Sequence, residues 1–206
     1  IVISHNHYDH LDEASIRELA RVQPRIKFLV PLGLKTVLEE WGVRNVTELD
    51  WWEPLKIGGV KFQPTPVKHW SKRTFFDRNK TLWAGWMVQW RDFAFYFAGD
   101  AGYSSDFKKT VKKLGKPDLA AIPIGAYEPR KFMKSAHINP EEAVKVFTDL
   151  GAKYAIGIHW GTFKLTLEPM SEPPIRLTKA LNAAGVDSKA FRTLKHGETW
   201  PDVLLN

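Results

Sequence analysis

The chain has 206 residues, 44% of them hydrophobic, which is enough to bury one good-sized core, so a single domain is the simplest organisation. It contains no cysteine, which excludes disulfides and thiolate metal ligands, and no stretch approaches the ~18 unbroken apolar residues that a membrane span needs. The formal charge of +7 favours anionic partners such as phosphate esters, an anionic lipid surface or nucleic acid, and serves plain solubility equally well.

The chain opens with three apolar β-formers that run into a polar turn, Ile1-Val2-Ile3-Ser4-His5-Asn6-His7-Tyr8-Asp9-His10. Three of the seven histidines fall in this turn, which favours a metal site over a polar loop with scattered histidines. His5 and His7 are two residues apart, so on extended backbone their imidazoles point the same way and can hold one ion. Asp9 and His10 follow within one turn and can hold a second ion. Imidazole and carboxylate donors without thiolate suit Zn²⁺, with Mn²⁺, Fe²⁺ or Ni²⁺ as alternatives.

Downstream of this turn, the apolar spacing predicts short helices and strands. In chain order we expect a helix, a strand, a helix, a strand and two hairpins, at 14–21, 26–30, 32–41, 46–52, 55–62 and 83–98. Asp12 is the expected N-cap of the first helix, Pro31 ends the first strand and Gly42 closes the second helix. Gly58-Gly59 forms the first hairpin turn, and 64–80 is loop-like.

The second half of the chain alternates between helices and strands. We expect helices at 105–114, 140–150 and 174–184, and strands at 119–124, 154–158 and 190–194. Hairpins followed by β–α alternation, without repeats or low-complexity linkers, indicate an α/β sandwich rather than a doubly wound sheet.

Further metal-ligand candidates stand at or just beyond strand ends. His69 lies in a loop beyond the first hairpin, and His159 ends the strand at 154–158. Asp100 follows the second hairpin and is placed to bridge two cations, because each carboxylate oxygen can bind one ion. Taken singly, each has an ordinary structural interpretation, as a packed histidine or a turn aspartate.

The His-x-His-x-Asp-His motif after a hydrophobic strand resembles the metallo-β-lactamase superfamily. The longer string Ser-His-Asn-His-Tyr-Asp-His-Leu-Asp resembles its branch of N-acyl-phosphatidylethanolamine-hydrolysing phospholipase D, as do the later His-Trp, Phe-Ala-Gly-Asp and Ile-His-Trp-Gly-Thr-Phe segments. The resemblance implies a dinuclear zinc phosphodiesterase on an αββα sandwich. Because that fold places several strands before the motif, we expect 1–206 to be a single metallo-β-lactamase-like domain from the C-terminal part of a longer chain, whose N-terminal strands and any targeting signal lie outside this sequence.

The resemblance also assigns the ligands. One metal is then held by His5, His7 and His69, and the other by Asp9, His10 and His159, with Asp100 bridging. His137 resembles a family histidine near the substrate phosphate, where it would donate to a phosphoryl oxygen or the leaving group; the alternative is a loop histidine that supports a helix start. Asp9, Asp100 and His137 are thus the catalytic candidates, and no cofactor other than two Zn²⁺ is expected.

These residues favour hydrolysis by a metal-bridging hydroxide, since two cations flanking one water lower its pKa toward neutrality. The leading hypothesis is a phosphodiesterase of the phospholipase D type for N-acyl-phosphatidylethanolamine-like phospholipids. Three alternatives stay open: a lactonase or other ester hydrolase on the same site, a metal-dependent nuclease, and a non-catalytic metal-binding scaffold. We expect no nucleic-acid partner, because the sequence lacks the aromatic-basic patch that single strands require.

Contacts with a substrate or a membrane are suggested by basic and aromatic residues. Residues placed to collect an anion beside His69 are Lys68, Lys72 and Arg73. The basic side of an amphipathic helix, which suits an anionic membrane or simply solvent, carries Lys108, Lys109, Lys112 and Lys113. Tryptophans that would line an acyl-chain groove, or else fill the core, are Trp51, Trp52, Trp70 and Trp86. We expect a cytoplasmic or peripheral-membrane location; the sequence carries no signal for an oligomeric state.

Overall fold

The computed structural model describes residues 1–200 of the chain. Its helices are α1 (Glu13–Val22), α2 (Leu34–Glu40), α3 (Asp106–Leu114), α4 (Arg130–Met133), α5 (Pro140–Leu150) and α6 (Glu172–Ala184). Its strands are β1 (Phe28–Pro31), β2 (Val46–Leu49), β3 (Leu55–Ile57), β4 (Val60–Thr65), β5 (Gly85–Trp90), β6 (Phe93–Phe97), β7 (Leu119–Pro123), β8 (Tyr154–Ile158) and β9 (Phe191–Thr193). None of the described helices is long and apolar enough to cross a bilayer.

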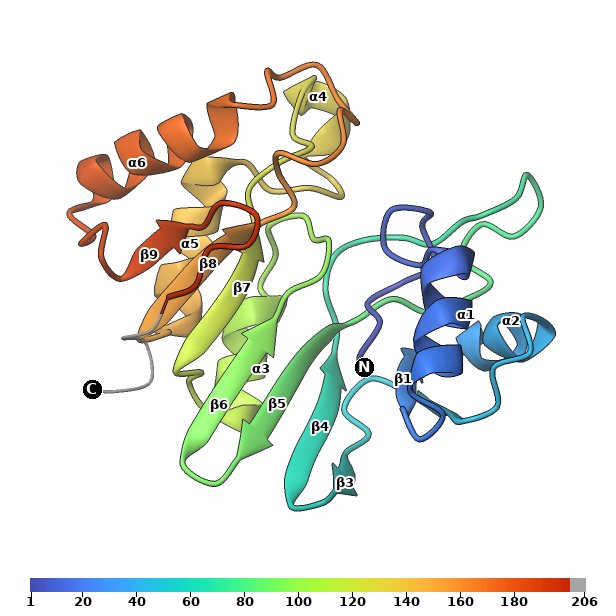
Figure 1. The fold of residues 1–206 in the computed structure, drawn as a ribbon. Helices are drawn as coiled ribbons and strands as arrows, with labels where there is room; N and C mark the ends of the chain where they lie inside the picture. The colour runs from blue at the N-terminus through green and yellow to red at the C-terminus, as the bar shows by residue number, and fades with distance from the viewer. Residues whose placement is uncertain (201–206) are drawn as a thin grey trace.

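The strands form two sheets (Figure 1). The larger sheet has seven strands in sequence order from β3 to β9, antiparallel up to β6 and parallel from β6 onward. The switch follows from the connections. Two-residue turns join β3 to β4 and β5 to β6, and a long loop joins β4 to β5, whereas α3, α5 and α6 supply the crossovers that parallel neighbours need. The smaller sheet is the parallel pair β1–β2.

The small sheet packs on one face of the large one and is covered by helices on its outer side. Leu29 and Leu49 of the small sheet share a buried cluster with Trp86 of β5. Ile16 of α1 and Leu38 of α2 belong to a second cluster, which lies on the outer side of β1 and β2. The first two layers of the fold are therefore α1–α2 and β1–β2.

The other face of the seven-stranded sheet carries the largest core cluster. Ile122 of β7 packs there with Phe107 of α3, with Val144 and Phe147 of α5, and with Leu181 of α6. The layers follow the order helix, sheet, sheet, helix, which confirms the αββα sandwich predicted from the sequence.

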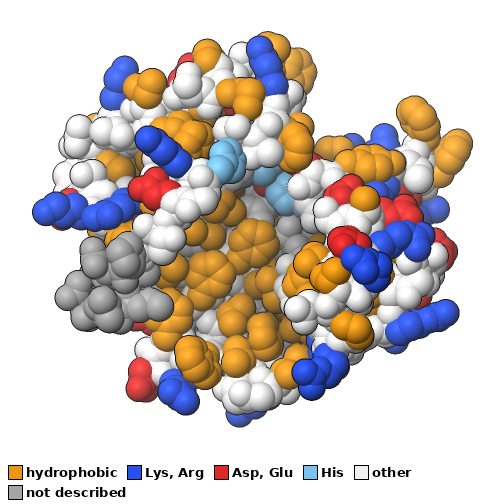
Figure 2. All heavy atoms as spheres, viewed as in Figure 1, with side chains coloured by type: hydrophobic (Ala, Val, Ile, Leu, Met, Phe, Trp, Pro, Cys, Tyr) orange, Lys and Arg blue, Asp and Glu red, His pale blue; other side chains and the backbone are white. Residues whose placement is uncertain are grey.

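Part of the large sheet is not covered by β1–β2. Along β6, Ala94 and Tyr96 face the helices, so the alternating residues Phe93 and Phe95 face the other way and stay half-buried. Figure 2 shows hydrophobic side chains across the floor of the hollow that lies over this part of the sheet, with histidines along its upper edge.

Most predicted elements are confirmed within a residue or two. Asp12 caps α1 by accepting a 2.8 Å hydrogen bond from Ser15 N. Helix α5 begins at the predicted proline and is held by a capping box between Asn139 and Glu142.

Four sequence interpretations need correction. The opening residues form only an isolated bridge, Val2 with Leu29, instead of a full strand. Strand β2 ends at Leu49, short of the predicted residue 52. Strand β4 continues through Pro64 into the predicted loop, since proline can occupy a ladder position that needs no N–H donor. The short helix α4 was not predicted, because four residues are too few to show a helical period.

Candidate metal centre

The opening turn is shaped by hydrogen bonds at both of its ends. Ile3 N bonds to Leu29 O at 3.0 Å, which ties the chain to β1 just before the first histidine. The amides of His10 and Leu11 then both donate to His7 O, at 3.0 and 2.9 Å, and so close a tight turn. The side chain of Leu11 is fully buried and fixes the start of α1. The turn therefore presents its histidines from a rigid base.

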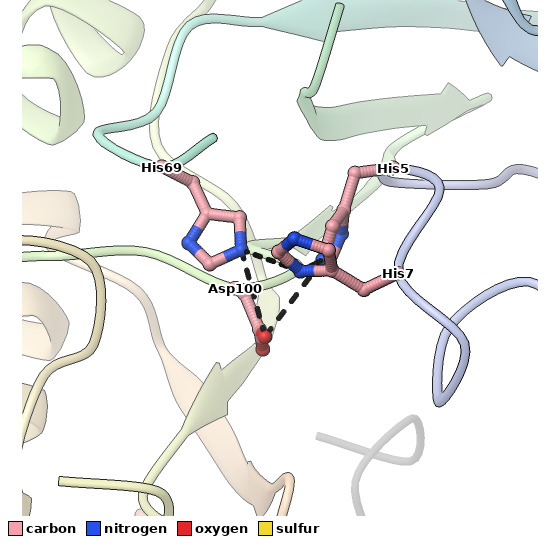
Figure 3. A group of neighbouring side chains, drawn as sticks. All are labelled: His5, His7, His69 and Asp100. Atoms are coloured by element: carbon pink, nitrogen blue, oxygen red, sulfur yellow. Dashed lines mark hydrogen bonds and ion pairs between the residues drawn. The ribbon is translucent and has the colours of Figure 1, made fainter. Parts of the chain in front are cut away.

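Four side chains form what we call the first donor group: His5, His7, His69 and Asp100. His5 Nε2 and His7 Nδ1 lie 2.8 Å apart, and His69 Nε2 lies 3.3 Å from the same His7 nitrogen (Figure 3). Asp100 Oδ2 is 3.9 Å from His5 Nε2 and 3.8 Å from His69 Nε2. These donors come from the opening turn, the loop after β4 and the end of β6.

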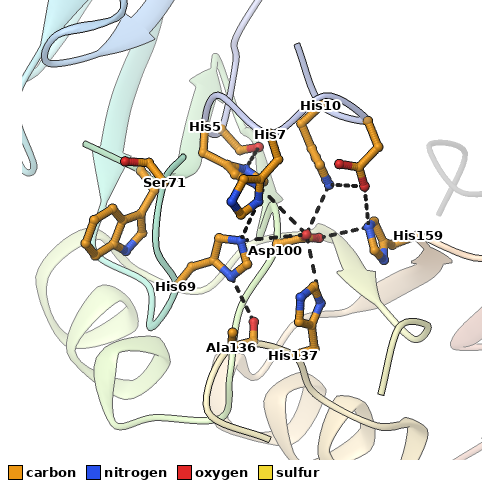
Figure 4. A network of polar contacts seen from close by, with 12 residues as sticks. His5, His7, His10, His69, Ser71, Asp100, Ala136, His137 and His159 are labelled. Atoms are coloured by element: carbon orange, nitrogen blue, oxygen red, sulfur yellow. Dashed lines mark hydrogen bonds and ion pairs between the residues drawn. The ribbon is translucent and has the colours of Figure 1, made fainter. Parts of the chain in front are cut away.

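The second donor group consists of Asp9, His10, Asp100 and His159. His10 Nε2 lies 3.3 Å from Asp9 Oδ2 and 3.1 Å from Asp100 Oδ2. His159 Nε2 lies 3.3 Å from Asp9 Oδ2 and 3.3 Å from Asp100 Oδ1 (Figure 4). Asp100 thus belongs to both groups and faces each with its carboxylate. All seven ligands predicted from the sequence lie in these two groups.

Both groups fit transition-metal ions. A tetrahedral zinc ion with bonds of ~2.0–2.1 Å spaces its donors roughly 3.3 Å apart, close to the separations found here. Two buried donor atoms, His10 Nε2 and Asp100 Oδ1, lack a hydrogen-bond partner in the described part of the chain, although each lies close to an oppositely charged side chain of the group. Buried polar atoms without partners are costly, and a bound cation removes that cost. The donor set of imidazole and carboxylate does not by itself select one metal.

Hydrogen bonds behind the donors orient two of the imidazoles. His69 Nδ1 donates to Ala136 O at 2.9 Å, which leaves Nε2 free to bind. His5 Nδ1 is hydrogen-bonded to Ser4 Oγ at 3.0 Å, again leaving Nε2 toward the other donors. Such outer partners fix the tautomer and raise metal affinity. Gly99, with φ of 61°, admits Ser4 beside it, because a Cβ there would lie 2.6 Å from Ser4 Cβ.

The backbone at the second group is held in an unusual conformation. His159 has a φ of 60°, in the left-handed region that a non-glycine residue occupies at a cost of ~1–3 kcal/mol. This turn ends β8 and directs the imidazole toward Asp9 and Asp100. Gly125 permits the arrangement, since a Cβ at that position would lie 2.1 Å from His159 O.

Burial keeps the histidines of the first donor group neutral. It lowers the pKa of His5 well below its ordinary value and the pKa of His69 to about 3, against the opposing charge of Asp100. Burial also lowers the pKa of His7. Neutral imidazole is the form that binds metal, so these three nitrogens are available at neutral pH.

The second donor group behaves differently because it holds two carboxylates. Burial acts to lower the pKa of His10, but Asp100 and Asp9 outweigh it and raise that pKa to about 10. The same carboxylates raise the pKa of His159. Burial opposes ionisation of Asp9 and Asp100, yet the neighbouring histidines hold both carboxyl pKa values below the usual range. Without a metal, protons on the histidines balance the carboxylates, so metal binding here releases protons.

His137 stands beside both groups and belongs to neither. Its Nδ1 lies 3.9 Å from Asp100 Oδ2 and has no hydrogen-bond partner in the described part of the chain, although the atom is buried. Its ring centroid is 5.2 Å from that of His69 and 5.8 Å from that of His159. Because its Nδ1 has no partner and its ring faces Asp100, the imidazole is available to a molecule bound over the two donor groups (Figure 4).

A cavity of about 280 Å³ opens beside the donors. Its lining is His7, Tyr8, Asp9, Trp70, Asp100, Ala126, Met133, His137, Leu165 and Thr166. Of the four tryptophans considered for a groove, only Trp70 lines this cavity. Trp86 is fully buried in the core, and Trp51 and Trp52 lie half-buried in the turn after β2.

Arg73, one of the residues that the sequence placed to collect an anion, braces the opening turn. Its Nη1 donates to Asn6 O at 3.0 Å and to Leu11 O at 2.6 Å, which are carbonyls on either side of the turn. Its guanidinium stacks on the Tyr8 ring at 4.2 Å, and the Tyr8 hydroxyl donates to Arg73 O at 3.0 Å. The sequence carried no local signal for this role, because the partners are more than 60 residues away.

Replacing Arg73 with methionine should therefore loosen the turn. Losing hydrogen bonds from a charged donor to two carbonyls should cost ~1.5–3 kcal/mol of unfolding free energy and weaken metal retention. Thermal melting and zinc retention against a competing chelator measure both effects. Lys72→Met is the matched control and should change neither. A variant with unchanged melting temperature and metal retention but a higher KM would instead make Arg73 an anion contact.

The layered fold and the paired donor groups are those expected of the metallo-β-lactamase superfamily. The chain belongs to that superfamily, since a family model described as the beta-lactamase superfamily domain matches residues 1–160. It is 44% identical to N-acyl-phosphatidylethanolamine-hydrolyzing phospholipase D 1 of Caenorhabditis elegans, over 97% of this chain and 59% of the relative. It is 36% identical to the mitochondrial protein of that name in Saccharomyces cerevisiae, over 93% of this chain and 42% of the relative.

The chain therefore spans about half the length of these curated relatives. Among solved structures, Igni18, a metallo hydrolase from Ignicoccus hospitalis KIN4/I, superposes with a TM-score of 0.73 at 23% identity, covering 97% of this chain and 77% of the other. At that identity the similarity concerns the fold alone.

Proposed function

We propose that the protein is a metal-dependent hydrolase that holds two ions, chiefly zinc, and cleaves phosphodiesters of N-acyl-phosphatidylethanolamine-like phospholipids. The observation that carries this proposal is a buried carboxylate, Asp100, shared by two donor groups that open on one cavity. The relatives named for that phospholipid support the substrate class. In this proposal His5, His7 and His69 hold one ion, Asp9, His10 and His159 hold the other, and Asp100 bridges them.

Different residues of the site would hold the ions and orient the substrate. Two ions at these positions would supply a hydroxide nucleophile from water and stabilise charge on the entering and leaving oxygens. Asp100 would hold both ions, since it is 3% exposed and lies among five histidines of the site. Asp9 contributes the second carboxylate and lines the cavity. His137 Nδ1 is placed to donate to a phosphoryl oxygen or to the leaving alkoxide.

The cavity supports a lipid ester as the substrate. The side chains of Trp70, Met133 and Leu165 give it an apolar wall opposite the polar donors. An acyl or alkyl group can lie on that wall while its ester reaches the donors. A small lactone uses little of this apolar surface, so we favour the phospholipid over the lactonase alternative.

Turnover of bis(p-nitrophenyl) phosphate compared with a simple lactone, on metal-replete protein, tests the reaction class. The proposal expects the phosphodiester to be cleaved with the higher kcat/KM, and it expects release of an N-acylethanolamine from N-acyl-phosphatidylethanolamine. Preference for the lactone would move the protein to carboxylic-ester chemistry. Absence of both activities in protein that retains two ions would favour a non-catalytic metal-binding scaffold.

Replacing His137 with alanine should lower kcat without removing metal. Acid–base or hydrogen-bond help of this kind is worth ~10²–10⁴-fold. The loss should be large for an N-acylethanolamine leaving group, which needs a proton, and small for p-nitrophenolate, which does not. Equal losses on both substrates would withdraw the catalytic role. His196→Ala is the matched control, because that imidazole bonds to the Thr162 hydroxyl at 3.0 Å and belongs to neither donor group.

A further inference from the structure

Three chain segments next to the metal centre carry exposed phenylalanines. Segment 71–80 follows His69, segment 130–135 precedes His137, and segment 161–170 follows His159. In Figure 1 they lie along the upper and upper-right edge of the molecule, around α4 and the tips of two long loops. Each exposes large aromatic side chains, which we call the apolar rim: Phe75 at 89%, Phe76 at 86%, Phe132 at 72% and Phe163 at 60% of their full accessible area.

The segments that carry the rim also contribute to the cavity over the donor groups. The wall of the cavity is built by Trp70, Met133 and Leu165, each of which lies in or directly beside one of the three segments. A flat surface that touched the rim would therefore face the opening over the donor groups. Large phenyl groups so exposed on neighbouring segments are unusual unless they meet an apolar environment.

Basic side chains accompany the rim. Lys131 and Lys134 flank Phe132, and Lys164 follows Phe163; all three are exposed, and none forms an ion pair within residues 1–200. The acidic residue of the first segment, Asp77, is occupied by the backbone amides of Arg73 and Thr74. Figure 2 shows hydrophobic and basic side chains together along this upper edge.

We infer that the apolar rim docks the protein on an anionic phospholipid bilayer, with the cavity mouth facing the membrane. Phenyl side chains would enter the interfacial region while the lysines stay at the headgroups, each worth ~1 kcal/mol of attraction near an anionic surface. The inference rests on the proposed function only for the statement that the membrane supplies the substrate. Helix α3 packs on the opposite, helix-covered face of the large sheet through Phe107, and its Lys108 and Lys109 pair with Asp149 and Asp106.

Vesicle co-sedimentation tests the docking surface. Wild-type protein should bind vesicles of phosphatidylcholine with phosphatidylserine and bind phosphatidylcholine alone more weakly. The triple variant Phe75→Ser, Phe76→Ser, Phe132→Ser should bind at least ~10-fold more weakly, since burying even one phenyl side chain is worth about 1.5–3 kcal/mol. Trp90→Ser removes a 49% exposed aromatic residue from the β5–β6 hairpin and should leave binding unchanged.

The same variants separate docking from catalysis. The triple variant should cleave soluble bis(p-nitrophenyl) phosphate at the wild-type rate, because none of its three positions lines the cavity, and should lose activity on substrate in vesicles. Asp100→Asn should bind vesicles like the wild type whether or not the protein is a phosphodiesterase. The inference is overturned if the triple variant binds anionic vesicles as well as the wild type, if the wild type binds none, or if the rim instead mediates self-association or binding to DNA.

Discussion

Replacing Asp100 by asparagine should lower hydrolytic turnover by at least ~10²-fold while the protein stays folded. The change preserves the size of a side chain that is 3% exposed, so the surrounding packing is retained. It removes the negative charge that both donor groups share and leaves one oxygen where two are needed. The variant should retain fewer than two ions per chain, because the second ion loses one of its two carboxylates. Kinetics on bis(p-nitrophenyl) phosphate, elemental analysis and thermal melting measure the three effects.

The matched control is Asp92→Asn, which removes the same charge from an exposed turn between β5 and β6. It should behave as the wild type in all three measurements. Turnover within a few-fold of the wild type in Asp100→Asn protein would show that Asp100 is not the bridge. A variant that fails to fold can be replaced by Asp100→Glu, which keeps the charge and displaces it by one methylene, and should lose turnover but retain metal.

The part of this site that could be predicted from the sequence is the part encoded in short motifs. Spacing alone placed His5 and His7 on one side of an extended segment, and strand ends placed Asp100 and His159 at one edge of a sheet. The αββα layering followed from hairpins that give way to β–α alternation, together with the family resemblance. These features depend on residues close in sequence, so local periodicity is enough to reveal them.

What could not be predicted depends on contacts between distant segments. The basic neighbours of Arg73 in the sequence suggested that it binds an anion. Its hydrogen bonds to carbonyls of the opening turn, more than 60 residues away, could not be predicted. Trp86 looked available for a groove, but the small sheet covers it. The apolar rim could not be predicted for the same reason: its three phenylalanine-bearing segments are far apart in sequence, and they are brought together by His69 and His159 of the donor groups and by the neighbouring His137.

Removal of metal is the other change from which we expect a large effect. Protein purified without chelator should contain close to two transition-metal ions per chain, chiefly zinc, and stripping them should abolish turnover. Readdition of zinc should restore it. Stripping should also lower the melting temperature, because a ligand at 1,000 times its Kd adds ~4 kcal/mol to the stability of the folded state. The melting temperature should fall because removing the metal leaves buried donor atoms of the two donor groups without partners.

Acidification should weaken metal loading at the second donor group before it affects the first. A metal must displace protons from His10 and His159, whose pKa values are raised, whereas His69, with a pKa of about 3, stays neutral. Lowering the pH favours those protons over the ion, so the second ion should leave at a higher pH than the first. Metal content measured after dialysis across a pH series, alongside Arg73→Met as a destabilised reference, gives the order of loss. The two-metal assignment would be overturned if elemental analysis of protein prepared at neutral pH found no metal, or calcium alone. Simultaneous loss of both ions would mean that Asp100 couples the two donor groups too tightly for them to lose their ions at different pH values.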